Sequence, residues 1–124
     1  MSCVIVEVPA DQEAELKAWM GRHLGRAIDV PDLRSAGLHF AGGRMFVVND
    51  RPVGEFMYTR ADGRPIGVCL TRMAGASAPP RIEQNGGERL ASWIAGGYAY
   101  VVVGELDDPT AADLARRVAV QVNG

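Results

Sequence analysis

Apolar and polar positions divide the chain into an opening strand and helix, a long run of short strands, and a closing helix. Residues 4–8 are rich in β-branched side chains, which predicts a strand that ends at Pro9. Apolar positions then recur every three or four residues. This spacing predicts a helix over residues 11–24, with Asp11 as its cap and Gly25 as its stop. The apolar stripe of this helix consists of Leu16, Trp19, Met20, His23 and Leu24.

The middle of the chain, residues 37–104, has the pattern of antiparallel strands, because short apolar runs alternate with turn residues. Two dipeptides have the composition of tight hairpin turns, Gly42-Gly43 and Asp62-Gly63. Residues 98–103 are almost all apolar or aromatic, which predicts a central strand covered on both faces. Residues 73–80 are rich in small residues and proline and predict a mobile loop. The expected strands are residues 38–40, 44–48, 53–60, 64–72, 88–94 and 98–103, with residues 27–30 and 81–84 as further extended pieces.

The last helix is predicted to begin at Asp108-Pro109, with the aspartate as its cap and the proline as its first helical residue. Its apolar stripe consists of Ala111, Leu114, Ala115, Val118 and Val122. All these elements belong to one domain over residues 1–124. The predicted fold class is α+β, an antiparallel meander sheet of about five or six strands with an N-terminal and a C-terminal helix packed on one face.

The composition is that of an ordinary globular domain, with 124 residues of which 48% are hydrophobic and 23% charged. A net charge of -2 lacks the cationic excess that nucleic-acid binding needs, so nucleic acid is not a predicted partner. The sequence contains no apolar run of about 18 residues and no signal-peptide pattern. Cys3 and Cys69 are too few for a disulfide scaffold and are interpreted as small buried hydrophobes; whether they pair is left open.

Motifs that carry catalysis or bind a cofactor are not found in the sequence. The side chains that could ligate a metal, at His23, His39, Cys3 and Cys69, are scattered and lack CxxC, HxxxH or HExxH spacing. The glycine pairs lack the spacing of a phosphate-binding loop, and no serine lies in a GxSxG elbow. We therefore predict no catalytic, cofactor-binding or metal-ligating residue and no cofactor, and we expect the protein not to be an enzyme.

Aromatic side chains in the expected strands are the remaining candidates for a ligand or partner surface. They are Tyr58, Trp93, Tyr98 and Tyr100, together with Arg64 in one of the hairpins. Tyr98 and Tyr100 project from the same face of their strand, because alternate residues of a strand share a face. The main alternative is that these aromatic side chains belong to the core. A further alternative is a small enzyme whose cleft is lined by Tyr58, Tyr98 and Arg64.

Short local motifs follow one another in a fixed order along nearly the whole chain. They are Val8-Pro9-Ala10, Leu16, Trp19, Arg22, Leu24-Gly25, Pro31-Asp32-Leu33, Gly37-Leu38, Gly42-Gly43-Arg44-Met45, Phe56-Met57-Tyr58, Gly63-Arg64, Trp93, Gly97-Tyr98 and Gly104-Glu105-Leu106. This ordered set resembles the C-terminal extracytoplasmic domain of the transmembrane anti-sigma factors, a family of transmembrane transcriptional regulators. Gly42-Gly43-Arg44-Met45 is similar to a glycine–glycine–arginine–aliphatic hairpin of that family.

The resemblance implies a non-catalytic sensory domain. In such proteins a cytoplasmic domain sequesters an extracytoplasmic-function sigma factor, a single transmembrane helix follows, and the extracytoplasmic domain senses or transmits stress. The sequence has neither a membrane helix nor the His-x3-Cys-x2-Cys zinc pattern of many anti-sigma domains. The chain is therefore expected to reach the sigma factor and the membrane only through segments that the sequence lacks. It would lie on the periplasmic side of the inner membrane, or in the cytoplasm if Met1 is the true start.

Two further roles stay open at this stage. One is a stand-alone module that binds a small ligand. The other is a dimerisation module that acts through an exposed sheet edge, and it is compatible with the sensory role. The identity of the signal, the ligand and the sigma factor, and the oligomeric state, are not determined by the sequence.

Overall fold

A computed structural model describes residues 3–123, with side chains described for residues 7–122. These residues form seven strands, two α-helices and two short 3₁₀ turns. In chain order these are β1 (Cys3–Pro9), η1 (Ala10–Gln12), α1 (Glu13–Leu24), η2 (Arg34–Ala36), β2 (His39–Val48), β3 (Arg51–Thr59), β4 (Pro65–Arg72), β5 (Arg81–Asn85), β6 (Glu88–Ala95), β7 (Tyr98–Gly104) and α2 (Asp108–Asn123). No helix among these residues is long and apolar enough to cross a membrane.

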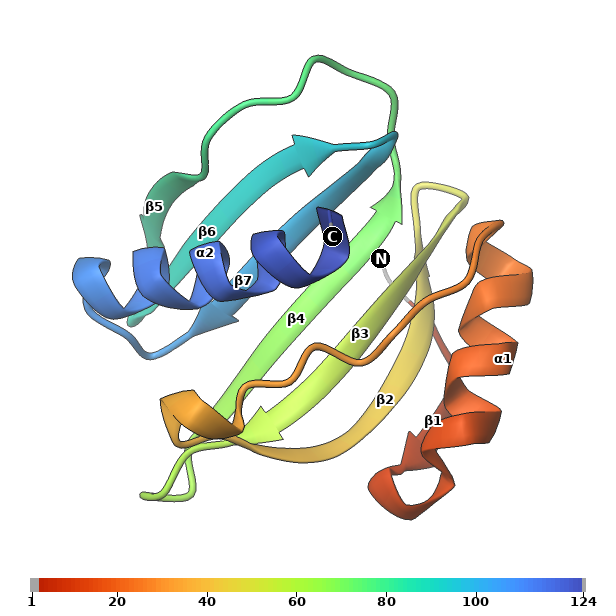
Figure 1. Cartoon of the computed structure of the whole chain (residues 1–124), viewed down its shortest axis with the longest axis horizontal. Helices are drawn as coiled ribbons and strands as arrows, with labels where there is room; N and C mark the ends of the chain where they lie inside the picture. Colours follow the sequence, from red (N-terminus) through yellow and green to blue (C-terminus); the bar gives the residue numbers. More distant parts are fainter. Residues whose placement is uncertain (1–2, 124) are drawn as a thin grey trace.

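The strands form one antiparallel sheet in the order β1-β2-β3-β4-β7-β6-β5. This confirms the α+β class, and Figure 1 shows both helices on the same face of the sheet. The sheet has seven strands rather than about five or six, since β5 pairs with β6 and extends one edge. It is not one continuous meander either, because β4 pairs with β7 and not with β5.

The two helices cover different parts of the sheet, and an extended segment crosses between them. The first helix packs against β1, β2 and β3, and the second against β5, β6 and β7. Residues 26–33, which we call the strap, run across the same face between the two helices (Figure 1). The core lies between the sheet and these three elements. Its fully buried members include Leu16, Met20, Leu24, Leu33, Met45, Phe56, Val68, Tyr100, Val102 and Val118.

The strap is tied to both the sheet and the second helix. The hydroxyl of Tyr58 on β3 donates to the carbonyl oxygen of Pro31 at 2.6 Å. On the other side, the amide of Gln121 on α2 accepts from the backbone N–H of Asp32 at 2.7 Å and donates to its carbonyl at 2.9 Å. Ile28 and Leu33 anchor the strap in the core. The strap therefore bridges the two helix-bearing halves of the fold.

The predicted hairpin turn at Gly42-Gly43 is wrong, because both glycines lie inside the continuous strand β2. A register shift between Phe40 and Gly42 marks a bulge there. A Cβ atom on Gly42 would lie 2.6 Å from the carbonyl oxygen of Val8, and one on Gly43 would lie 2.6 Å from Cδ2 of Leu16. The absence of a side chain at these glycines allows β1 and α1 to approach the strand closely. The chain turns at Asn49 and Asp50, which have φ of 50° and 63°.

The predicted helix caps need two corrections. Asp11 lies in the 3₁₀ turn η1, and the first helix has no side-chain cap. The second helix is capped by Asp107 rather than Asp108, since Oδ1 of Asp107 accepts from the backbone N–H of Thr110 at 2.8 Å. Asp108 instead pairs with Arg89 at 2.7 Å. The predicted stop of the first helix at Gly25 is confirmed by its left-handed conformation, with φ of 84°.

The apolar stripe of the first helix is buried only in part. Leu16, Met20 and Leu24 are fully buried, whereas Trp19 is half-buried. His23 is exposed, and its Nδ1–H donates to the carbonyl oxygen of Trp19 at 3.0 Å. The imidazole also contacts the indole edge-on, with 5.5 Å between ring centroids. His23 is thus a helix-edge histidine with a satisfied hydrogen bond, and not a buried member of the apolar stripe.

Strand β7 is covered on one face only, which corrects the prediction for residues 98–103. Tyr98, Tyr100 and Val102 are buried under the helices, while Val101 and Val103 on the opposite face are half-exposed. No helix of the described chain lies over that opposite face, which we call the open face (Figure 1). Its half-buried apolar members are Phe46, Val53, Met57, Cys69, Leu90, Ile94, Ala99, Val101 and Val103.

Candidate functional site

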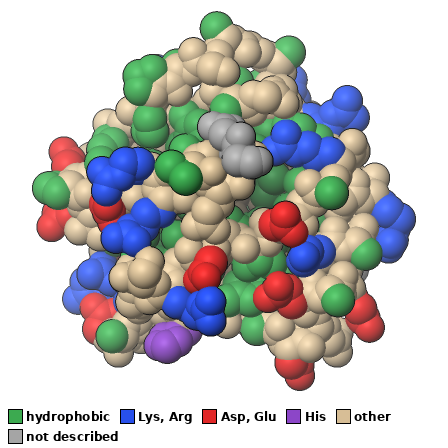
Figure 2. Space-filling model, in the orientation of Figure 1, with side chains coloured by type: hydrophobic (Ala, Val, Ile, Leu, Met, Phe, Trp, Pro, Cys, Tyr) green, Lys and Arg blue, Asp and Glu red, His purple; other side chains and the backbone are tan. Residues whose placement is uncertain are grey.

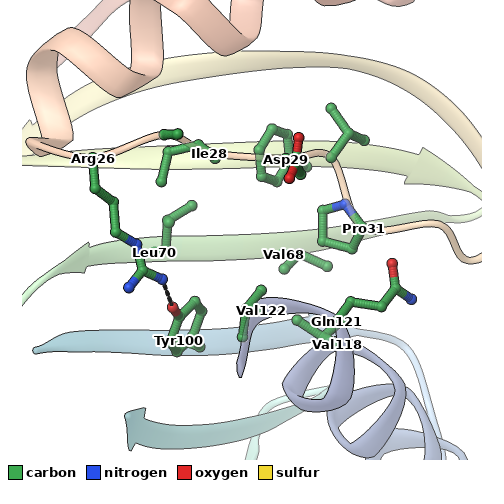
Figure 3. A pocket seen from close by; sticks show the side chains of 13 residues that line it. Arg26, Ile28, Asp29, Pro31, Val68, Leu70, Tyr100, Val118, Gln121 and Val122 are labelled. Atoms are coloured by element: carbon green, nitrogen blue, oxygen red, sulfur yellow. Dashed lines mark hydrogen bonds between the residues drawn. The ribbon is translucent and has the colours of Figure 1, made fainter. Parts of the chain in front are cut away.

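A cavity of about 160 Å³ lies on the helix-bearing face, beneath the strap. Figure 3 shows that three parts of the fold meet around it, the strap, the sheet and the second helix. The strap forms one wall with residues 26–31. The sheet forms the floor with Phe56, Val68, Leu70 and Tyr100, and the second helix forms the other wall with Val118, Gln121 and Val122. The floor is mainly apolar, whereas the walls contribute polar groups, so the lining as a whole is polar and apolar in about equal parts.

Arg26 lies at one end of this cavity and is its only lysine or arginine. Its guanidinium carbon lies 4.1 Å from the centre of the Tyr98 ring, which is a cation–π contact. Its Nη2 donates to the hydroxyl oxygen of Tyr100 at 2.6 Å. None of the ion pairs within the described residues involves Arg26. The cavity thus has a half-buried cation that is held in place by aromatic groups and not neutralised by a carboxylate.

Tyr100 completes the polar end of the cavity. Its ring stacks on that of Trp93 with centroids 5.3 Å apart, and its side chain is almost fully buried. Burial raises the pKa of Tyr100, and the nearby Arg26 opposes this shift. The phenol is therefore neutral near pH 7. Since its oxygen accepts from Arg26, its own proton is available for a second partner.

The opposite end of the cavity is closed by the contact of Gln121 with the strap. Gln121 contacts the backbone of Asp32, and the Asp32 side chain pairs with Arg34 at 2.8 Å. Hydrogen bonds from the side chain and the backbone of Arg34 lower the pKa of Asp32 to about 2. Asp29, which lines the rim, is highly exposed and pairs with Lys17 at 3.0 Å. Both carboxylates already have cationic partners, so neither neutralises Arg26.

Three of the five side chains predicted for a ligand or partner surface come together near this site. Tyr98 and Tyr100 contact Arg26, and Trp93 stacks on Tyr100. The hydroxyl of Tyr98 is not free for a ligand, because it donates to the carbonyl oxygen of Leu24. The indole N–H of Trp93 is buried without an acceptor among the described residues.

The other two side chains lie elsewhere. Tyr58 is buried, pairs with Ile66 at one end of β4, and contacts the strap through its hydroxyl. Tyr98 pairs with Arg72 at the other end of the same strand. Arg64 is exposed, with Nε 3.6 Å from Asp62 and 3.5 Å from Glu105. The cleft of Tyr58, Tyr98 and Arg64 on which the enzyme hypothesis depends is therefore not formed.

The residue that the sequence prediction missed is Arg26. The only local signal was its place directly after the Gly25 stop, which says that it leaves the helix but not where its side chain goes. Its partners Tyr98 and Tyr100 are more than 70 residues away, so the contact depends on the pairing of β7 with β4. The extended piece predicted at residues 27–30 is the strap itself, although it joins no strand.

A second polar group lies on the open face. Nε of Arg44 lies 2.6 Å from Oε1 of Glu55, and the thiol of Cys69 lies 3.5 Å from Oε2 of the same carboxylate. Burial and the Glu55 charge raise the pKa of Cys69 far above its usual range, so the thiol stays protonated and is a poor nucleophile. The predicted role of Cys3 lies outside the described side chains.

The described residues hold no cluster of three or more side chains that could ligate a metal ion. Figure 2 shows cationic and anionic side chains interspersed over the helix-bearing face, without a patch of one sign. The chain matches none of the protein-family models and none of the curated proteins with which it was compared.

Proposed function

We propose that this chain is a non-catalytic sensory and regulatory domain, of the kind that lies on the extracytoplasmic side of a membrane-anchored anti-sigma factor. The observation that carries the proposal is the cavity beneath the strap, which the sheet, the strap and the second helix all line. An occupant of such a cavity contacts each of the elements whose relative position a sensor must change. The resemblance of the ordered sequence motifs to those of the anti-sigma factors supports the regulatory part of the proposal.

Several residues of those motifs hold this arrangement together. Gly43 makes room for Leu16 of the first helix, Tyr58 bonds to the strap, and Leu33 anchors the strap in the core. Gly25 ends the first helix and lets the chain turn into the strap, directly before Arg26. These four motif residues therefore lie where the first helix, the strap and the sheet meet, which supports a role that depends on the relative position of these elements.

The proposal is tested in the bacterium that carries the gene. An adjacent sigma-factor gene and a membrane-spanning segment in the same gene product are expected. Deletion of the codons for residues 3–123 should uncouple the sigma-dependent promoter from its inducing stress, measured with a promoter fusion. Deletion of the upstream sigma-binding region in the same gene is the matched control and should leave the promoter constitutively active. An unchanged stress response after the first deletion contradicts the sensory role.

The second candidate function is self-association, and the open face is the observation that favours it. This face is half-exposed and largely apolar in its centre, and its charged residues are of both signs, among them Glu7, Arg44, Glu55, Arg81 and Glu83. The same face of a second copy is therefore compatible with it in both polarity and charge. Sedimentation over a wide concentration range tests this. Val101→Glu on the open face should lower the mass to that of a monomer, whereas Val120→Glu on the exposed side of α2 should not.

A further inference from the structure

We propose that the cavity beneath the strap binds a small monocarboxylate with a compact apolar body, such as an aromatic or short-chain acid. The carboxylate would lie against Arg26 and Tyr100, and the body would lie over Val68 and Leu70. This inference deepens the proposed sensory function, because it names the chemical class of the ligand that the domain would detect.

The size of the ligand follows from the volume of the cavity. A cavity of about 160 Å³ is close to the volume of about 150 Å³ at which an apolar cavity accepts a benzene-sized molecule. Nucleotides, sugars with several rings and two-chain lipids are too large. A carboxylic acid of about ten heavy atoms or fewer fits, provided that its polar end lies at the Arg26 end of the cavity.

The charge of the ligand follows from Arg26. Arginine has five N–H donors, and the structure records one of them bonded, to Tyr100. The Tyr98 ring and the Tyr100 hydroxyl fix the plane of the guanidinium, so little side-chain entropy is lost when an anion binds. The Tyr100 proton adds a second donor beside the first. A planar carboxylate, which accepts two parallel hydrogen bonds, matches this pair of donors.

A single negative charge fits better than two. Arg26 is the only cation among the residues that line the cavity, and Asp29 lies at its rim. A phosphate dianion would be only half neutralised by the single positive charge of Arg26, whereas a monocarboxylate would be neutralised in full. The apolar floor of Val68 and Leu70 further favours a ligand whose remaining atoms are hydrocarbon.

Binding would also reach the second helix. The ligand would touch the strap on one side and Val118 and Val122 on the other, next to the contact of Gln121 with Asp32. The structure records no hydrogen bond from the backbone of residues 27–30 to another described residue, so this part of the strap depends on side-chain packing, while the hydrogen bonds of the strap lie at Pro31 and Asp32. An occupied cavity should therefore slow the opening of the strap and steady its contact with α2.

The test uses sodium benzoate as the probe and ¹⁵N-labelled protein at pH 7. Benzoate should cause saturable chemical-shift changes in the strap and in the last two turns of α2. Benzamide has the same shape without the charge and should bind at least about tenfold more weakly, as expected for the loss of one charge-assisted hydrogen-bond pair. Hexanoate, run in parallel, distinguishes an aliphatic from an aromatic body.

Three variants locate the site. Arg26→Gln should weaken benzoate binding about tenfold or more and leave benzamide binding within about twofold. Arg64→Gln removes an exposed arginine outside the cavity and should change neither. Val122→Phe places a ring in the cavity and should abolish the binding of both probes.

The proposal is overturned if benzoate gives no saturable shift up to about 20 mM, a limit well above the millimolar range of weak specific ligands. It is also overturned if benzamide binds as well as benzoate, or if Val122→Phe leaves binding intact. These measurements on the isolated chain are independent of the promoter assay. Benzoate binding with a stress response that does not need the domain would support the ligand class and contradict the proposed function.

Discussion

At some positions of this fold the absence of a side chain matters as much as side-chain contacts do at others. Gly43 is the clearest case, because the side chain of Leu16 occupies the volume in which a Cβ would lie. The position has no positive φ, so the requirement for glycine there is purely steric. The first helix can approach the sheet closely only because this position has no side chain.

We expect Gly43→Ala to lower the free energy of unfolding by about 1–3 kcal/mol, because the added methyl group overpacks the core against Leu16. Gly87→Ala is the matched control, since a Cβ there meets nothing within 4 Å. It should change stability by less than about 0.5 kcal/mol. Urea denaturation at pH 7 measures both. Equal losses in the two variants would contradict the steric role of Gly43.

Glu55 is the one buried charged residue among the described side chains, and Arg44 is its partner. Gly67 on the next strand makes room for this carboxylate, because a Cβ there would lie 2.5 Å from Oε2. Arg44→Met should therefore cost about 2 kcal/mol at pH 7, since it leaves a buried charge without its counter-ion.

The double variant Arg44→Met with Glu55→Met should recover most of that loss, because no unpaired charge remains. Arg81→Met breaks an exposed contact with Glu83 at 3.8 Å and serves as the control, with an expected effect below about 0.5 kcal/mol. Chemical denaturation of the wild type, Arg44→Met, Glu55→Met and the double variant gives the coupling. A double variant less stable than Arg44→Met would show that the pair is not held as described.

At the scale of the elements, the second helix is defined by its first turn and by its link to the strap. Asp107 satisfies the N–H of Thr110, which would otherwise have no partner at the helix start. This hydrogen bond lowers the pKa of Asp107 below its ordinary value of 3.8. A carboxyl whose pKa is lowered in the folded state stabilises the fold above the unfolded pKa. That contribution disappears as the pH falls through the lower value.

Asp107→Asn keeps an acceptor for Thr110 but removes the charge at the helix N-terminus. At pH 7 its melting temperature should lie below that of the wild type, because the charge favours the helix dipole. The difference should shrink as the pH falls below 3.8, when the wild-type carboxyl becomes protonated as well. Thermal melts at pH 7 and at pH 2–3 measure this. A gap that grows in acid would contradict the assignment of Asp107 as the cap.

The strap is an element without secondary structure of its own, so its order should respond to single contacts. Gln121→Ala removes both hydrogen bonds to the backbone of Asp32. The N–H of Asp32 should then exchange with solvent faster, by a factor of about 10 if its local opening loses about 1.4 kcal/mol. Gln84→Ala in the β5–β6 hairpin is the control and should leave this exchange rate unchanged. Hydrogen exchange followed by NMR gives both rates.

At the scale of the whole molecule, the sequence predicts elements better than it predicts their neighbours. The fold class, the helices on one face and the strands around Asp62-Gly63 follow from hydrophobic periodicity and turn chemistry, which are local signals. A glycine pair is typical of both a tight turn and a bulge, and at Gly42-Gly43 only the position of the Leu16 side chain distinguishes the two.

The cavity could not be predicted for the same reason. Arg26 meets Tyr100 only because β7 pairs with β4, although β5 and β6 lie between these two strands in the sequence. The apolar run of β7 predicted cover on both faces, whereas the structure covers one and leaves Val101 and Val103 half-exposed. Periodicity reports how apolar a strand is, but the number of layers around it depends on the rest of the chain.

The β4·β7 ladder has a consequence for how the molecule could be divided. It joins two contiguous segments, each with its own helix, and the exposed loop at residues 73–80 is the only covalent link between them. Fragments 1–76 and 77–124 should therefore reassemble when they are expressed together, because cutting an exposed loop removes little of the buried contact. Co-purification on a tag carried by one fragment measures this. Val102→Lys in the buried ladder should prevent it, and Val120→Lys on the surface should not. The affinity of the two fragments for each other would then measure the strength of the contacts between the halves. A ligand that strengthens the contact of the strap with α2 should raise this affinity.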